Sequence, residues 1–213
     1  MVELFLIRHA ECEANTQHGK VWGRSLQSPL TNIGRIQAAA LGRQLTKEGV
    51  YFDAVYTSPA ERTKDTASIA CEELGYPTSK IMVSDWLHQQ SHGEWEGKAR
   101  NDVVQQNSLF RLGHWHFRAP GGESLQDVEN RMSEWLNTNV LQQAHMKSVA
   151  VFTHHMAIKG LLRNVLRLDP SMVNSMAVDT SAVTHLKYMG GQWNVVKINY
   201  APHLKVLGMK TVY

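Results

Sequence analysis

The hydrophobic positions of this chain form short apolar runs that alternate with stretches of helical spacing. Between the runs, apolar residues recur every three or four positions, which indicates helices. The runs have the length and composition of buried strands, and they cover 4–7, 52–57, 80–83 and 149–152. The predicted helices cover about 33–45, 62–74, 125–136 and 158–165.

The last third of the chain changes to an alternating pattern. Residues 181–188 and 193–198 alternate apolar with polar positions, and Gly190-Gly191 between them predicts a hairpin. Strands that alternate with helices and end in a hairpin predict an α/β fold. We expect a three-layer helix–sheet–helix sandwich around a mostly parallel central sheet.

One segment breaks the pattern. From residue 85 to 120 regular periodicity is lost, and we interpret about 86–120 as a cap or specificity insertion in a single domain spanning 1–213. Its aromatic, histidine and arginine side chains could stack on a substrate, but they could equally pack the loop onto the domain. These residues are Trp86, His114, Trp115, His116 and Arg118.

Composition narrows the class of partner. The chain is 43% hydrophobic and 19% charged, with a net charge of only +3, which predicts a globular protein with a small anionic substrate rather than nucleic acid. It has no apolar run that could cross a membrane and no signal-peptide pattern. Cys12 and Cys71 show no disulfide or metal spacing, so we expect a cytoplasmic protein. The protein could also form a homodimer.

The candidate catalytic residues directly follow predicted strands. Arg8-His9 follows the first strand, Ser58 and Arg62 follow the second, and Thr153-His154 follows the fourth. Parallel strands place such ends along one edge of the sheet, where α/β proteins bind ligands. Two arginines and two histidines there suit phosphoryl transfer, in which an imidazole attacks phosphorus and cations bear the charge on oxygen. Metal binding is not expected, because no Asp or Glu accompanies the histidines at ligand spacing and arginines repel a cation.

Six segments, in order along the chain, resemble the histidine phosphatase superfamily, in its phosphoglycerate mutase-like branch. The nucleophile motif stands as Arg8-His9-Ala10-Glu11 with Asn15, and the second histidine motif as Thr153-His154. The other four segments are Ser28-Pro29-Leu30-Thr31 with Gly34, Ser58 to Thr63, Gly93-Glu94-Trp95-Glu96-Gly97, and Pro120 to Ser124. The resemblance implies the phosphoglycerate mutase-like fold and no cofactor or metal.

The resemblance also implies roles for single residues. His9 would be the nucleophile that becomes a phosphohistidine, while Arg8, Arg62 and His154 would hold the phosphoryl oxygens. Water would then hydrolyse the phosphoenzyme. Asn15, Gly23, Ser58 and His155 are the further substrate-binding candidates.

Three positions depart from the family pattern. Ala10 replaces the usual glycine, and His155 follows His154 where glycine is common. Gln89 stands where the family carries the glutamate that acts as general acid, and an amide cannot give a proton to a leaving alkoxide. Three explanations are open: an engineered Glu-to-Gln variant, a different donor such as Glu94, His88 or His92, or a substrate with a good leaving group such as phosphohistidine or an acyl phosphate.

Phosphatases and mutases of this superfamily share these catalytic residues and differ in their loops. The stretch Gln90-Ser91-His92-Gly93-Glu94-Trp95 resembles the phosphatase branch rather than the E-R-H-Y-G segment of cofactor-dependent mutases. We therefore expect a metal-independent phosphatase that hydrolyses a small phosphorylated metabolite. The alternatives are a phosphohistidine or acyl-phosphate phosphatase, a mutase-type phosphotransferase, and a catalytically impaired binding or regulatory protein.

Overall fold

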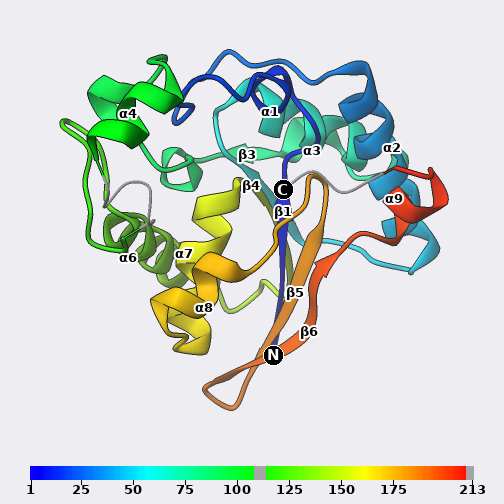
Figure 1. Cartoon of the computed structure of the whole chain (residues 1–213). Coiled ribbons are helices and arrows are strands. Elements are labelled where there is room, and N and C mark those ends of the chain that lie inside the picture. Colours follow the sequence, from blue (N-terminus) through cyan, green and yellow to red (C-terminus); the bar gives the residue numbers. More distant parts are fainter. Residues whose placement is uncertain (108–113, 210–213) are drawn as a thin grey trace.

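A mixed sheet forms the centre of the molecule. The computed structural model describes residues 1–107 and 114–209, and within them six strands lie in the order β3-β2-β4-β1-β5-β6 (Figure 1). The neighbours from β3 to β1 pair in parallel, whereas β5 and β6 are antiparallel. The strands are β1 Val2–Arg8, β2 Ala54–Thr57, β3 Met82–Val83, β4 Ser148–Thr153, β5 Val183–Met189 and β6 Gln192–Tyr200. The predicted mostly parallel sheet with a closing hairpin is confirmed.

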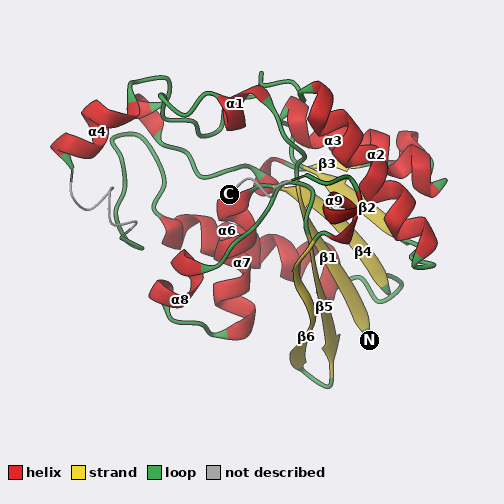
Figure 2. Cartoon of the chain, turned by 45° about the vertical axis from the view of Figure 1, so that its right-hand side comes forward, coloured by secondary structure: helices red, strands yellow, loops and turns green. Residues whose placement is uncertain are grey.

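Helices cover both faces of this sheet, which gives the predicted three layers (Figure 2). The helices α2, α3 and α9 lie on one side, and α6, α7 and α8 lie on the other. The helices are α1 Glu13–Thr16, α2 Asn32–Lys47, α3 Glu61–Leu74, α4 Arg100–Gln106, α6 Leu125–Leu136, α7 His155–Leu166, α8 Pro170–Ser175 and α9 Pro202–Val206. Short 3₁₀ turns occur at Thr78–Lys80, Asp85–Leu87 and Gly93–Trp95, and a π-helical turn at Asn137–Leu141.

The apolar run of β1 is explained by its position in the middle of the sheet. Leu4 and Leu6 pack with the α6–α7 layer, while Phe5 and Ile7 pack with the α2–α3 layer. All four side chains are buried, because successive residues of a strand point to opposite faces and both faces are covered. The strand therefore holds its last residue, Arg8, and the adjoining His9 at a fixed place where the carboxyl ends of the parallel strands lie.

The helix at 125–136 begins with the reciprocal hydrogen bonds of a capping box. Ser124 Oγ accepts from the Asp127 amide, and the Asp127 carboxylate accepts from the Ser124 amide. These bonds satisfy amides that the first turn leaves unpaired, so the helix starts at a defined residue.

The expectation of irregular structure from 85 to 120 is wrong at 100–106, which forms α4. Its apolar positions Val103 and Val104 are too few to give a periodic signal, although Val103 is buried. Residues 108–113 of this segment lie outside the described residues, and the single-domain division with a cap stays a prediction. In the part of the chain that is described, no helix combines the length and apolarity needed to cross a bilayer.

A substitution at Gly34 tests how closely α2 packs against the backbone of Glu11. A Cβ on Gly34 would come within 1.9 Å of the Glu11 carbonyl oxygen, so only glycine lets the first turn of α2 approach the segment after the first strand. We expect Gly34→Ala to lower the free energy of unfolding by about 1–3 kcal/mol, the usual cost of overpacking. Urea denaturation measures it, with Gly19→Ala as control because a Cβ there meets nothing within 4 Å. Equal stabilities for the two variants would contradict the close approach.

Candidate active site

The ends of three adjacent parallel strands converge as predicted. The His9 amide donates to the Thr153 carbonyl at 3.0 Å, and the Ser58 amide donates to the Phe152 carbonyl at 3.1 Å. The strand order β2-β4-β1 therefore brings the residues after each strand to one edge of the sheet. The chemistry predicted from separate strand ends lies together in one place.

The imidazole of His9 is held by its own chain. Its Nδ1 lies 2.8 Å from the Ala10 carbonyl oxygen, and a carbonyl can only accept, so Nδ1 carries the hydrogen. In the neutral ring Nε2 then holds the free lone pair. Burial first, and the positive charges of Arg62 and Arg8 next, hold the pKa of His9 well below its ordinary value. The ring is therefore neutral near pH 7, with Nε2 available as a nucleophile.

Two buried arginines accompany this ring. Arg8 Nη1 donates to the Val178 carbonyl at 2.6 Å, while Arg62 donates to the carbonyls of Ser25 and Gly23 at 2.8 and 3.3 Å. Burial lowers the pKa of Arg8 to about 10, so the group is still a cation at neutral pH. These carbonyl partners are neutral and leave the positive charge to act on a bound anion.

Two side-chain amides add hydrogen-bond donors. Asn15 Oδ1 accepts from the backbone amide of Cys12 at 3.0 Å and from its thiol, and Gln89 Oε1 accepts from the Met156 amide at 3.1 Å. With the oxygens occupied, the NH₂ ends are the donors that Asn15 and Gln89 offer to the pocket they line. Arginine and amide N–H groups together suit the oxygens of a phosphoryl group.

His154 and Ser58 lie beside His9. The rings of His9 and His154 are 5.2 Å apart between centroids, and His154 Nε2 bonds Ser58 Oγ at 2.7 Å. Ser58 is fully buried and also contacts Thr63 Oγ1 at 3.0 Å, so its hydroxyl orients His154. Burial, with Arg62 and His9 as further causes, keeps the pKa of His154 well below its ordinary value.

The pocket at this edge contains most of the predicted site residues. Arg8, His9, Arg62, Asn15, Gly23, Gln89 and His155 line it, whereas Ser58 and His154 are not among its lining residues. Sequence reasoning missed Cys12, Ala14, Trp22 and Ser25, which complete the lining. The polar, Gly- and Ser-rich character of residues 19–31, next in sequence to the His9 motif, was the available signal for Trp22 and Ser25.

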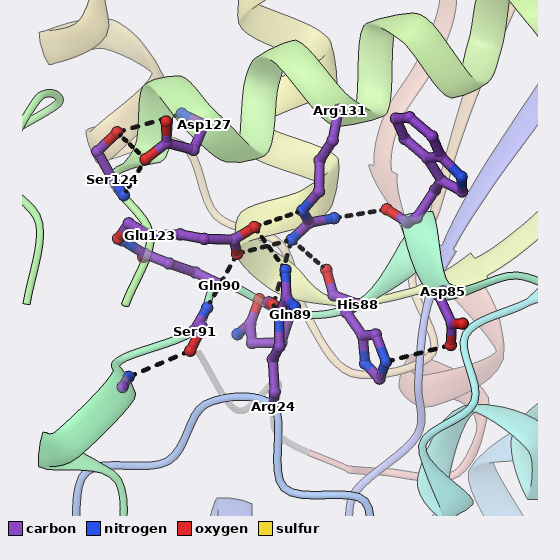
Figure 3. Close-up of polar contacts among 12 residues, drawn as sticks. Arg24, Asp85, His88, Gln89, Gln90, Ser91, Glu123, Ser124, Asp127 and Arg131 are labelled. Atoms are coloured by element: carbon purple, nitrogen blue, oxygen red, sulfur yellow. Dashed lines mark hydrogen bonds and ion pairs between the residues drawn. The ribbon is translucent and has the colours of Figure 1, made fainter. Parts of the chain in front are cut away.

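A network of ion pairs holds the loop that bears Gln89 (Figure 3). Arg131 bonds the carbonyls of Trp86, His88 and Gln89, and its guanidinium also pairs with Glu123. Arg24 joins from the opposite side, because it contacts both the Gln89 carbonyl and the Glu123 carboxylate. Arginine can do this because its planar fork offers five donors. The position of Gln89 is therefore set by residues far away in the sequence.

The aromatic residues of the 86–120 segment mostly pack rather than line the pocket. Trp115 is buried, donates to the Glu129 carboxylate at 3.1 Å and lies under Arg163, while Trp95 stacks on Phe117. Arg118 pairs with Asp127 at 2.7 Å. Of the described residues of this segment, Gln89 alone lines the pocket. The alternative acids suggested from the sequence, His88, His92 and Glu94, do not line it.

A second hollow lies at the opposite edge of the sheet, around the start of β1. Among its lining residues, Glu3 pairs with His185 and Glu48 pairs with Lys197. We place the chemistry at the His9 pocket, where two buried arginines lie beside the imidazole and bond backbone carbonyls. In the described residues there is no cluster of three or more His, Cys, Asp or Glu side chains that could hold a metal ion.

Comparison with known proteins agrees with this geometry. The family model of the histidine phosphatase superfamily (branch 1) matches residues 4–201. Phosphoserine phosphatase 1 of Hydrogenobacter thermophilus is 30% identical over 96% of this chain and 95% of its own length. The 2,3-bisphosphoglycerate-dependent phosphoglycerate mutase of a Methylobacterium species is 28% identical, over 75% of this chain and 78% of that protein.

Solved structures share the fold. Bacillus stearothermophilus YhfR superimposes with a TM-score of 0.83 at 27% identity, covering 96% of this chain and all of that one. The α-ribazole phosphatase of Shigella flexneri gives a TM-score of 0.81 at 23% identity, over 94% and 97% of the two chains. The chain belongs to the histidine phosphatase superfamily, branch 1. Within that superfamily it is a phosphatase.

The Arg131 network generates a stability test. Arg131→Met leaves the carbonyls of Trp86 and His88 without their cationic donor and leaves Glu123 and the Gln89 carbonyl with Arg24 alone, so we expect the free energy of unfolding to fall by about 1.5–3 kcal/mol. The matched control is Arg118→Met, which removes a pair whose arginine is 59% exposed and should change it by less than about 1 kcal/mol. Urea unfolding of both variants is the measurement, and equal losses would count against a special role for Arg131.

Proposed function

We propose that this phosphatase hydrolyses a small phosphorylated compound through a phosphohistidine at Nε2 of His9, without a metal ion. The observation that carries the proposal is the orientation of the His9 ring, with Nδ1 on the Ala10 carbonyl and a pKa low enough to leave Nε2 unprotonated. Such a ring is ready to attack phosphorus without first losing a proton.

The surrounding groups support the two steps. In the first, His9 Nε2 forms a bond to phosphorus and the leaving group takes the electron pair of the bond that breaks. In the second, water attacks phosphorus, the N–P bond breaks, and its electron pair returns to Nε2. Arg8 and Arg62 would stabilise negative charge on the phosphoryl oxygens in both steps, with Asn15 as a further donor.

The names of the relatives and the charge of the chain support the substrate class. Proteins of similar sequence are named for phosphoserine and phosphoglycerate chemistry, which supports a small phosphorylated metabolite. The mild net charge and the absence of dense Lys/Arg runs support a small anion over nucleic acid.

His9→Ala is expected to abolish both hydrolysis and covalent phosphorylation while leaving the fold intact, because it removes the attacking nitrogen. Turnover and acid-labile ³²P incorporation are measured with acetyl phosphate and with p-nitrophenyl phosphate. His18→Ala is the matched control, since His18 is exposed and outside the pocket. Retained turnover in the His9 variant would remove His9 as the nucleophile.

Chelation should leave the activity unchanged. Two arginines already supply positive charge of the kind that a divalent cation would supply to a phosphoryl group, and they would repel such an ion from the pocket. The measurement is turnover after dialysis against EDTA, with and without added Mg²⁺, Mn²⁺ or Zn²⁺. Loss on chelation, reversed by one of these metals, would contradict the metal-independent mechanism.

A further inference from the structure

Hydrolysis of an alkyl phosphate in this pocket would require a group that donates a proton to the leaving oxygen. A leaving alkoxide is about as strong a base as hydroxide, whose parent water has a pKa of about 16, so phosphatases protonate it as it departs. The described residues that line the pocket include no aspartate and no glutamate. Two carboxylates of the loops beside the pocket are engaged in other contacts: Glu96 accepts from the amides of Arg24 and His92, and Glu123 pairs with Arg131.

Gln89 occupies the acid position with its amide locked. The Met156 amide, in the first turn of α7, donates to Oε1, so the end of the group that can face the substrate is the NH₂. This group can donate a hydrogen bond to a leaving oxygen, but it cannot release a proton. The backbone of Gln89 is fixed as well, through the bonds of its carbonyl to Arg131 and Arg24 (Figure 3).

Four other protic groups of the lining are hydrogen-bonded elsewhere or carry no acidic proton. The Ser25 hydroxyl donates to the Gln27 carbonyl, and the Trp22 indole donates to the Gln17 carbonyl. The Cys12 thiol donates to Asn15 Oδ1 at 3.2 Å. Burial, with Arg8 and Lys159 as further causes, lowers the pKa of His155 to about 3, so its ring is neutral at pH 7 and carries no acidic proton to give.

We propose that this site is specialised for phosphoryl donors whose leaving group departs as a weakly basic anion, above all acyl phosphates. This inference rests on the proposed function. Attack by His9 Nε2 on an acyl phosphate forms the N–P bond and breaks the P–O bond, and the carboxylate keeps the electron pair. A carboxylic acid has a pKa of only about 4, so the carboxylate needs no proton at neutral pH.

Gln89 fits this substrate class by its chemistry. Its NH₂ donates a hydrogen bond to the departing carboxylate oxygen, which spreads the developing charge without transferring a proton. The second step also balances without an acid: water bonds to phosphorus, its proton passes to solvent, and Nε2 recovers its lone pair. A carboxylate at position 89 would instead repel an anionic leaving group whenever it is ionised.

The first test uses the unmodified protein. The rate of single-turnover phosphorylation of His9 is measured for acetyl phosphate, p-nitrophenyl phosphate, phenyl phosphate and two alkyl phosphates, glycerol 3-phosphate and phosphoserine. We expect the rate to fall steeply as the leaving group becomes more basic, by about 10²-fold or more between acetyl phosphate and the alkyl members, the size of the missing acid contribution. Similar rates across the series would overturn the proposal.

The second test restores an acid. Gln89→Glu should speed phosphorylation by alkyl phosphates about 10²-fold or more and should not speed phosphorylation by acetyl phosphate, which flattens the dependence on the leaving group. With alkyl substrates the rate of this variant should also fall as pH rises and the new carboxyl ionises, whereas the unmodified chain should lack that limb. Gln105→Glu, an exposed change outside the pocket, is the matched control and should alter neither slope nor pH profile.

A third variant separates hydrogen bonding from packing. Gln89→Met keeps the shape of the side chain without its donor, and it should slow acetyl phosphate as well as alkyl phosphates. Unchanged acetyl phosphate rates in this variant, or equal acceleration of all substrates by Gln89→Glu, would overturn the proposal. Absence of phosphorylation with every donor, acetyl phosphate included, would instead overturn the proposed function itself.

Discussion

The parallel pairing of β4 with β1 on one side and β2 on the other is the contact on which the site depends. The register sets Arg8 opposite Thr153 and Thr57 opposite Phe152, so His9, Ser58 and His154 emerge side by side. A slip of one residue in any of these strands would turn its buried apolar face toward the wrong layer. The burial of Leu4, Leu6 and their neighbours therefore also fixes the alignment of the catalytic groups.

The same burial prepares the pocket for an anion. Arg8 and Arg62 are removed from water, and the amides of Asn15 and Gln89 have their oxygens occupied. Desolvation of a cation costs free energy, and a phosphoryl group that accepts from the two arginines offsets part of this cost. His9 is affected too, because burial, together with the positive charges of Arg62 and Arg8, lowers its pKa and keeps the ring neutral.

The strand ends could be predicted because an apolar run that stops at Arg-His, Ser-Pro or Thr-His is a local signal. The fold and the convergence of His9, Arg62 and His154 follow from that signal together with the rules for parallel sheets. The features that could not be predicted depend on long-range contacts. Nothing in the residues around Gln89 shows that Arg131 holds their carbonyls, or that Trp115 would turn to Glu129 rather than to the substrate. Those partners are chosen by tertiary packing.

The surroundings of position 89 show why an amide and a carboxyl differ there by more than one proton. The Met156 amide belongs to the N-terminal turn of α7, which favours a negative charge, and two guanidinium groups bond the adjacent carbonyl. A glutamate here would be pulled toward its ionised form by these groups, whereas partial burial and the charge of a bound phosphoryl group would favour the protonated form. Glutamine has no such equilibrium between a protonated and an ionised form. The amide is a donor at every pH at which the fold is stable, so the site loses acid assistance for basic leaving groups and keeps a constant hydrogen bond for those that need none.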